Sequence, residues 1–429
     1  VTLFALLPLS ATAQTIELWV HEFPPLQEAL TTRWIPQFEA ANPGVTVKMT
    51  AIPFTGVVSY QAKLLTALST GGGPDLFDLG SWEYERFLDN GYLAPLDPTL
   101  LGYADTSALL ADYVPNTLTF ATRDGSVYAL FSEYNTLALF FNQDMFDAAG
   151  IPYLSETEPT SWDDIGNIAG RLTRRDARTG AYDAVGYQFG FFSNFRSPQW
   201  YAQNFYAIMR QHGQDDIYVD GVPAADSEAA VAAFQTIYDF TFVYDAYNPD
   251  AIANWFGDFP QERVGMVLAG TWFVPAIRGF DPDQRFGVAP HPVTDPSDRD
   301  TWKNIQWSWG WSLNPNSDAA RREAAHAFLR FMLGGDGDAD QAAWWFQNLG
   351  YLQPKQGLFE HPDYLAYLEA NPWLNAFTQA FEDYELGYVQ HSYDEAGAAL
   401  VRAIDRIIYD RMTPADTARL LQNELVRGF

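Results

Sequence analysis

Residues 64–91, LLTALSTGGGPDLFDLGSWEYERFLDNG, contain the arrangement that decides the fold. A helical stretch stops at GGGP (71–74), because glycine and proline terminate regular structure. The following DLFDL (75–79) predicts a short buried strand, and residues 84–90 predict a helix that stops at Gly91. Helix, strand and helix in close succession are typical of an α/β protein with a parallel sheet.

The residues before this stretch extend the same pattern toward the N-terminus. IELWV (16–20) and VTVKMTAI (45–52) predict strands, with a loop at 21–26 and a helix at 29–41 between them. The resulting β-α-β-α-β-α order predicts a parallel sheet whose ligands bind beyond the carboxyl ends of its strands. Those ends carry polar and aromatic side chains, which include His21, Glu22, Trp82 and Glu83.

The remaining chain continues to alternate and becomes helical at its end. Further strands are predicted at 127–130, 136–142, 187–191, 264–269 and 286–289. From residue 362 onward nearly all segments have helical periodicity. No internal repeat and no low-complexity linker separates the parts, which indicates lobes built from discontinuous segments.

Residues 306–313, QWSWGWSL, place tryptophan at every second position. In a strand, Trp307, Trp309 and Trp311 project to one face, and the opposite face carries only small side chains. Such a bare face lets another backbone or a ligand approach closely. Indoles suit both a buried core and a surface that stacks on a ligand, so periodicity alone leaves both interpretations open.

Composition narrows the class of function. Hydrophobic residues make up 48% and aromatic residues 16% of the chain, enough for a large core and an aromatic-lined pocket. The net charge of −29, from 54 acidic and 25 basic residues, argues against binding to nucleic acid or to anionic membranes.

Several chemical classes are excluded by missing motifs. The chain has no cysteine, so it offers no disulfide, thiolate zinc site or lipid-modified cysteine. No phosphate-binding G-x-x-x-x-G-K-[ST], no G-x-S-x-G and no H-E-x-x-H is present. Residues 336–340, DGDAD, begin like a calcium loop, but Gln341 and Gln347 stand where an EF-hand needs glycine and glutamate. We therefore expect neither a metal nor a cofactor.

The N-terminal residues 1–13 predict a remnant of a secretory signal peptide, with an apolar run and the cleavage motif Ala11-x-Ala13. No later run is long enough for a membrane span. The mature chain is expected to be exported and soluble, without membrane insertion and without a lipid anchor.

Motifs over most of the chain resemble the extracellular solute-binding proteins of ABC importers for sugars, in particular the maltose-binding branch. The N-terminal part of the resemblance lies in IELWV, FEAANPGVTV and the stretch 64–91. It continues in TLALFFNQDMFDAAGIP, PTSWDDI, ERVGMVLAGTWFVPAI, FGVAPHP, WGWSLNPNSDAARREAAHAFLRFML and GYLQPK.

The resemblance implies two Rossmann-like α/β lobes joined by three crossover strands, with a helical C-terminal region. Lobe 1 would comprise residues 14–134 and 308–351, and lobe 2 residues 135–307 and 352–429. Ligand would bind in the cleft between the lobes, and the lobes would close over it by hinge motion.

The resemblance also assigns candidate ligand-binding residues. Asn135 falls where the maltose branch has a carboxylate that holds sugar hydroxyls, and Trp272 matches a stacking tryptophan. Trp309 and Trp311 would form the floor of the site, whereas Trp307 would pack in lobe 2. The complete implied set is His21, Glu22, Trp82, Glu83, Asn135, Trp200, Gln203, Trp272, Trp309 and Trp311.

The function expected from this set is that of a monomeric periplasmic protein, not an enzyme, which binds a mono- or oligosaccharide and delivers it to ABC permease subunits. One alternative is a secreted carbohydrate-active hydrolase with a carboxylate pair drawn from Glu22, Glu83 and Glu133. A second is a binding protein for another polar solute, such as a polyol or a glycerophosphodiester.

Overall fold

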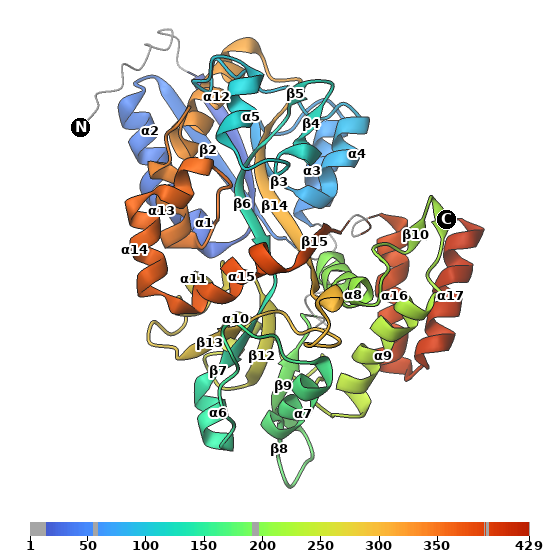
Figure 1. The fold of residues 1–429 in the computed structure, drawn as a ribbon. Helices are drawn as coiled ribbons and strands as arrows, with labels where there is room; N and C mark the ends of the chain where they lie inside the picture. Colours follow the sequence, from blue (N-terminus) through green and yellow to red (C-terminus); the bar gives the residue numbers. More distant parts are fainter. Residues whose placement is uncertain (1–13, 55–58, 191–196, 390, 392–393, 429) are drawn as a thin grey trace. The chain divides into compact units, whose positions relative to one another are not determined.

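The computed structural model describes residues 14–54, 59–190, 197–389, 391 and 394–428 (Figure 1). The predicted signal-peptide segment, residues 1–13, lies outside the described residues. The chain folds into two compact units. Unit 1 comprises Val1–Tyr134 and Ser308–Tyr367, and unit 2 comprises Asn135–Trp307 and Leu368–Phe429.

The chain passes from one unit to the other three times. Two crossings lie within strands, β6 (Leu130–Thr136) and β14 (Lys303–Leu313), and the third lies within helix α14 (Pro362–Ala370). The third crossing was expected as a strand, at residue 352. Residues 352–367 instead belong to unit 1, where Leu352 O accepts a 2.8 Å hydrogen bond from the backbone N–H of Tyr134.

Unit 1 contains a sheet with helices packed against it. Its N-terminal helices and strands are β1 (Gln14–His21), α1 (Pro24–Ala29), η1 (Leu30–Trp34), α2 (Ile35–Ala41), β2 (Val45–Ile52), α3 (Tyr60–Ser69), β3 (Leu76–Gly80), η2 (Ser81–Glu83), α4 (Tyr84–Asp89), α5 (Thr106–Asp112), η3 (Thr119–Ala121), β4 (Thr122–Arg123) and β5 (Ser126–Val127). Its later helices are α12 (Ala319–Leu333), α13 (Asp340–Leu349) and η5 (Gln356–Glu360).

The parallel sheet predicted for the N-terminal part is confirmed. Strand β1 pairs in parallel with β2, from Gln14 opposite Val45 to His21 opposite Ile52, and in parallel with β3. Figure 1 shows α3 and α4 on one side of this sheet and α2 and α13 on the other. The carboxyl ends of β1 and β3 therefore lie at the same edge of the sheet.

The first helical segment begins earlier than predicted. Residues 24–41 form α1, a π-helical turn η1 and α2 in succession, although 21–26 was expected to be a loop. Pro24 and Pro25 occupy the first helical turn, where a missing N–H costs no hydrogen bond. The π turn ends two residues before Pro36, which has no backbone N–H for regular i→i−4 hydrogen bonding.

Strand β14 contains the tryptophan-rich segment and adds to unit 1 beside β3. The two strands are antiparallel, with Trp309 opposite Gly80. On the face with small side chains, a Cβ on Gly310 would lie 2.4 Å from Phe131 Cδ1 and 2.8 Å from Tyr84 Oη. The close approach predicted for that face is therefore made by side chains of the same unit.

A buried lysine holds the acidic loop between α12 and α13. Lys355 is fully buried, and its Nζ lies 2.5 Å from Gly335 O, 2.8 Å from Asp338 O and 2.9 Å from Asp112 Oδ2. Burial lowers the pKa of Lys355, and the carboxylate of Asp112 opposes that shift. The carbonyl oxygen of Asp338, within the segment 336–340 that began like a calcium loop, and that of the preceding Gly335 thus bind an ammonium group.

Unit 2 contains a second sheet and most of the C-terminal helices. Its elements up to residue 301 are β7 (Ala138–Asn142), α6 (Gln143–Ala149), α7 (Trp162–Leu172), β8 (Arg174–Arg175), β9 (Tyr182–Gln188), α8 (Pro198–Gln211), β10 (Tyr218–Val219), β11 (Val222–Pro223), α9 (Glu228–Phe242), α10 (Trp255–Asp258), β12 (Val264–Ala269), α11 (Phe273–Arg278), β13 (Phe286–Ala289) and η4 (Arg299–Thr301). The C-terminal elements are η6 (Pro372–Leu374), α15 (Asn375–Asp383), β15 (Glu385–Tyr388), α16 (Glu395–Asp410) and α17 (Pro414–Arg427).

The sheet of unit 2 has the order β13-β7-β12-β9-β8. Only β12 and β9 pair in parallel, while β7 is antiparallel to both of its neighbours. This sheet is therefore mixed, whereas the three N-terminal strands of unit 1 are parallel. Within the described residues, no helix is both long and apolar enough to cross a membrane.

Candidate functional site

The carboxyl edge of the unit 1 sheet brings together three of the predicted residues. His21 is the last residue of β1, Trp82 lies in η2 directly after β3, and Trp309 lies opposite Gly80 at the end of β3. Because β1 and β3 are parallel and β14 is antiparallel to β3, these positions meet at one edge. We call His21, Trp82 and Trp309 the unit 1 cluster.

Asp78 of β3 holds His21 through both of its carboxylate oxygens. Oδ1 accepts the backbone N–H of His21 at 3.1 Å, and Oδ2 lies 2.6 Å from Nδ1 of the imidazole. Asp78 is 3% exposed, so these contacts replace the hydrogen bonds to water that its carboxylate loses on burial. In turn, Tyr60 donates a 2.6 Å hydrogen bond to the backbone carbonyl of Asp78.

Trp309 supports the imidazole from one face. The ring centroids of His21 and Trp309 lie 4.1 Å apart with an interplanar angle of 25°. Trp82 meets Trp309 edge to face at 5.2 Å, and Phe54 packs against it at 5.8 Å. Trp309 is consequently only 7% exposed, whereas Trp82 is half-buried and presents part of its indole to solvent.

Two further aromatic residues extend this cluster. Phe23 is stacked beside His21 at a centroid distance of 6.2 Å, and Tyr351 is stacked beside Phe23 at 6.1 Å. Burial raises the pKa of Tyr351 well above its ordinary value, and the nearby carboxylates of Glu133 and Asp78 act in the same direction. Tyr351 therefore keeps its hydroxyl proton at physiological pH.

The candidate carboxylates of unit 1 differ in their surroundings. Glu22 is exposed, and its backbone N–H bonds Ile52 O at 2.8 Å. Glu83 is 1% exposed and forms an ion pair with Arg86. Glu133 is also 1% exposed. The buried positions of Glu83 and Glu133 do not present a pair of solvent-accessible carboxylates of the kind that glycoside hydrolysis uses.

The other two tryptophans of β14 lie deeper than Trp309 does. Trp311 is 1% exposed, and its indole N–H donates a 3.0 Å hydrogen bond to Ser132 Oγ. Trp307 is 3% exposed and belongs to unit 2. Because the Trp311 side chain is covered on all sides, it lies in the core of unit 1 and does not join the unit 1 cluster.

In unit 2, Trp272 lies within a group of aromatic rings. It follows β12 and is the N-cap residue of α11. Trp200, Trp255 and Phe256 pack against its indole edge to face, at centroid distances of 5.7, 5.9 and 5.9 Å. Trp272 is 8% exposed. We call these four residues the unit 2 cluster.

Asn135 fixes the turn that carries Trp272. Its Nδ2 donates a 2.8 Å hydrogen bond to Thr271 Oγ1, and its Oδ1 accepts the N–H of Thr136 at 3.0 Å. A Cβ on Gly270 would lie 2.5 Å from Trp272 Nε1 and 2.9 Å from Asn135 Nδ2, so only glycine fits there. Asn135 is 1% exposed, and its amide bonds the residue that precedes Trp272.

Gln203 lies in α8 three residues after Trp200. It is 1% exposed, and within the described part of the chain its Oε1 has no hydrogen-bond partner. The amide Nε2 of Gln188 is also buried without a hydrogen-bond partner among the described residues. Buried polar atoms of this kind are usually satisfied by water or by a bound molecule.

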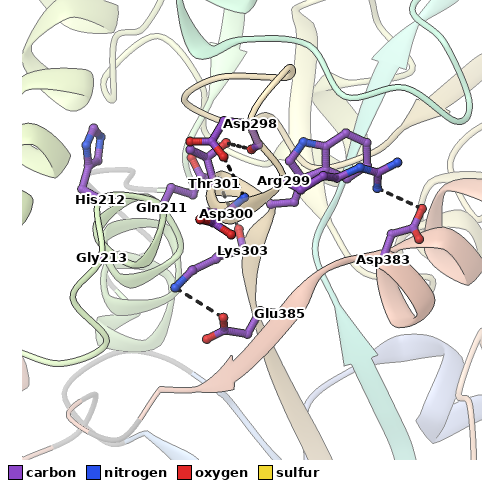
Figure 2. A pocket seen from close by; sticks show the side chains of 11 residues that line it. Gln211, His212, Gly213, Asp298, Arg299, Asp300, Thr301, Lys303, Asp383 and Glu385 are labelled. Carbon is purple, nitrogen blue, oxygen red and sulfur yellow. Dashed lines mark hydrogen bonds and ion pairs between the residues drawn. The ribbon is translucent and has the colours of Figure 1, made fainter.

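A separate cavity of about 510 Å³ lies in unit 2. Figure 2 shows its lining, in which Lys303 reaches Glu385 and Arg299 reaches Asp383. Trp200 and Gln211 lie at opposite ends of α8, about 16 Å apart at 1.5 Å per residue. The cavity is therefore distinct from the unit 2 cluster, and its two cations already have carboxylate partners.

Four contributors to the two clusters were not anticipated from the sequence. They are Asp78, Tyr351, Trp255 and Phe256. Asp78 could have been suspected, because a carboxylate in the middle of a buried strand needs a partner. The adjacent Trp255 and Phe256 carry no periodic pattern that separates a site from a core.

A family model described as "Bacterial extracellular solute-binding protein" matches residues 22–339. A putative binding protein of Brucella abortus (strain 2308) is 23% identical over 380 residues, which cover 88% of this chain and 84% of the relative. A putative binding protein of Brucella suis biovar 1 (strain 1330) matches with the same identity and coverage.

Solved structures share the fold over nearly the whole chain. A solute-binding protein of an ABC transporter from Thermotoga lettingae, bound with α-D-tagatose, has a TM-score of 0.76 and 20% identity, over 96% of this chain and 98% of that chain. The maltose/maltodextrin-binding domain of Bdellovibrio bacteriovorus, bound to maltotriose, has a TM-score of 0.76 and 19% identity, over 96% and 100%. A Mycobacterium tuberculosis protein in complex with glycerophosphocholine has a TM-score of 0.76 and 18% identity, over 96% and 98%.

Proposed function

Because this chain belongs to the bacterial extracellular solute-binding protein family, we propose that it binds a mono- or oligosaccharide for an ABC importer. The sugar would be passed to the transmembrane subunits of the permease. We further propose that the protein acts as a monomer in the periplasm and that it binds the sugar without converting it chemically.

The observation that carries this proposal is the composition of the unit 1 cluster. A half-buried indole, Trp82, lies beside an imidazole that is fixed by a carboxylate and by Trp309. Sugars have apolar C–H faces and a rim of hydroxyls, so they bind to flat aromatic surfaces with a small number of directional polar groups. His21 and Trp82 supply one of each within one cluster.

The candidate residues are proposed to have different roles. We assign direct sugar contact to the exposed Glu22 and to His21, Trp82, Trp200, Gln203 and Trp272. Glu83, Asn135 and Trp309 are proposed to act indirectly: Glu83 through its ion pair with Arg86, Asn135 through Thr271 beside Trp272, and Trp309 through the His21 ring that stacks on it. Trp311 is proposed to stabilise the core of unit 1 that supports the cluster.

A thermal-shift screen tests the ligand class. The full chain is heated with a library of neutral mono- and oligosaccharides, polyols, uronic acids and glycerophosphodiesters, each at the same concentration. A solute that binds only the folded state raises the melting temperature by mass action, so we expect the largest shift from a neutral sugar. A shift from a glycerophosphodiester alone would contradict the sugar assignment.

Incubation of the same protein with the sugar that gives the largest shift tests binding without turnover. Chromatography of the mixture after prolonged incubation is expected to recover the sugar unchanged. Release of shorter sugars, lost in a preparation that has been heat-denatured, would support the hydrolase alternative instead. Light scattering after size exclusion and cell fractionation test the monomeric state and the periplasmic location.

A further inference from the structure

We propose that Asp78 is a positioning residue that fixes His21 as a hydrogen-bond acceptor toward the ligand, so that the unit 1 cluster selects a neutral hydroxyl over an anionic oxygen. This inference rests on the proposed function, because it names the chemical group that the site recognises. It concerns the pair Asp78 and His21, which touch at 2.6 Å.

The location of the imidazole proton follows from the acceptors around it. Oδ1 of Asp78 accepts the backbone N–H of His21, and Oδ2 lies 2.6 Å from Nδ1 of the ring. An ionised carboxylate can only accept hydrogen bonds, so the ring proton lies on Nδ1. Nε2, on the far side of the ring from Asp78, then carries a lone pair when the ring is neutral.

The surroundings of His21 hold this arrangement in place. Trp309 and Phe23 flank the ring, which limits rotation about the side-chain bonds. Tyr60 packs edge-on against the imidazole at 6.4 Å and anchors the backbone of Asp78. Burial raises the pKa values of Tyr60 and Tyr351 well above 10, so both face the pair as neutral hydroxyls.

The charges near the pair disfavour an anionic ligand. Asp78 places a buried carboxylate against Nδ1 of the imidazole. Glu22, which follows His21 in the chain, adds an exposed carboxylate. Arg86 of α4 is engaged by Glu83, and the Lys63 ammonium lies over the ring of Trp19 at 5.5 Å. A ligand hydroxyl can donate to Nε2, whereas a carboxylate or phosphate oxygen would meet a lone pair there.

Asp75 provides a matched control on the same segment of chain. Its Oδ2 accepts the backbone N–H of Glu17 of β1 at 2.9 Å, as Asp78 does for His21, and it is 1% exposed. The other partners of its carboxylate are Ser317 and Arg321, and within the described ranges of the chain no imidazole bonds it. Asp75→Asn therefore perturbs a buried bridge between β1 and β3 without touching the His21 ring.

Nitrogen-15 NMR of the ligand-free full chain at pH 8 tests the tautomer directly. In the wild type we expect a protonated Nδ1 and an unprotonated Nε2 for His21, assigned by comparison with His21→Phe. In Asp78→Asn, one amide cannot accept from both N–H groups, so we expect the ring proton to move to Nε2. Asp75→Asn should leave the wild-type pattern intact. A protonated Nε2 in the wild type would overturn the proposal.

Calorimetric titration tests the consequence for recognition. The probes are maltotriose, α-D-tagatose and D-glucuronate. We expect a neutral sugar to bind the wild type, and Asp78→Asn to weaken it about tenfold, which is the effect of one misdirected hydrogen bond. Asp75→Asn should change the affinity less than twofold. Preferential binding of D-glucuronate by the wild type would overturn the selection of a hydroxyl.

The two tests separate the possible failures. If none of the probes nor any library sugar binds but the wild type has its proton on Nδ1, the proposed function fails and the tautomer assignment stands. If a neutral sugar binds and Asp78→Asn binds it equally well, the sugar assignment stands and the role of Asp78 fails. Thermal denaturation of each variant verifies that it is folded.

Discussion

The two clusters use aromatic residues in different ways. In the unit 1 cluster, an imidazole lies between a carboxylate and an indole, so a directional polar group is embedded among rings. In the unit 2 cluster, Trp272 is surrounded by Trp200, Trp255 and Phe256, all packed edge to face. Asn135 donates from its amide to Thr271, the residue that precedes Trp272 in the chain.

This difference implies a division of roles between the units. Edge-to-face rings supply apolar area without a preferred direction, whereas a fixed imidazole requires a partner of one polarity at one position. We therefore expect mutations in the unit 2 cluster to reduce affinity for all sugars alike. Mutations in the unit 1 cluster should change which sugar is preferred.

The largest effect is expected from Trp272→Ala. Truncation of a central aromatic residue at a binding surface commonly costs 2 kcal/mol or more, so we expect affinity for the best sugar to fall about 30-fold or more. Trp272→Phe should restore most of this loss. Trp373→Ala is the control, since Trp373 packs against Phe140 and Phe286 elsewhere in unit 2. Calorimetry on folded variants measures the change, and equal losses for Trp272→Ala and Trp373→Ala would contradict the assignment.

The three tryptophans of β14 should separate into two classes. Trp309→Ala removes the ring on which His21 stacks and should weaken sugar binding about tenfold. Trp311→Ala and Trp307→Ala remove buried side chains and should lower the free energy of unfolding by about 3–5 kcal/mol with little change in affinity. Chemical denaturation and calorimetry measure both quantities. Equal affinity losses for Trp309→Ala and Trp311→Ala would show that the two residues share one role.

Acidification should destabilise unit 2 through His291. Burial lowers its pKa from 6.5 to about 4, and its Nε2 has no hydrogen-bond partner among the described residues. Between these pH values the unfolded chain binds a proton that the folded chain excludes, so the free energy of unfolding falls as the pH decreases. The loss is roughly 3 kcal/mol across the window. Denaturation from pH 7 to pH 4 should show a shallower slope in His291→Gln; an unchanged slope would refute the assignment to His291.

The smallest effect is expected at the polar cavity of unit 2. Arg299 and Asp383 form an exposed pair at 3.4 Å, and such pairs contribute at most about 1 kcal/mol. Arg299→Ala and Asp383→Asn should therefore leave sugar affinity unchanged and stability nearly so. A substantial loss of affinity in either variant would place sugar recognition in this cavity.

The sequence predicted the architecture well where local signals were strong. The GGGP break, the strand DLFDL and the helix that stops at Gly91 define β3 and its flanking helices, α3 and α4. The resemblance to the solute-binding family was confirmed by the matching family model. The start of the first helix was missed because Pro24 and Pro25 are read as breakers, although both fit a first helical turn.

The site was less predictable, because packing depth is not encoded by periodicity. Trp309 and Trp311 occupy equivalent positions in QWSWGWSL, yet one stacks on His21 and the other is covered by the core. Glu83 was a candidate for ligand contact, and its ion pair with Arg86 depends on the conformation of the turn after β3. Asp78 becomes significant only when the neighbouring strand places His21 within its reach.

The contact of Lys355 with the loop that follows α12 has a consequence for the conditions in which this protein can work. The loop receives its positive charge from a side chain of the same polypeptide, so the charge is present at unit stoichiometry as soon as the chain folds. Dilution, chelators and changes in the ionic composition of the medium cannot remove it. The Lys355 contacts therefore resist the fluctuations that a dissociable ion would follow.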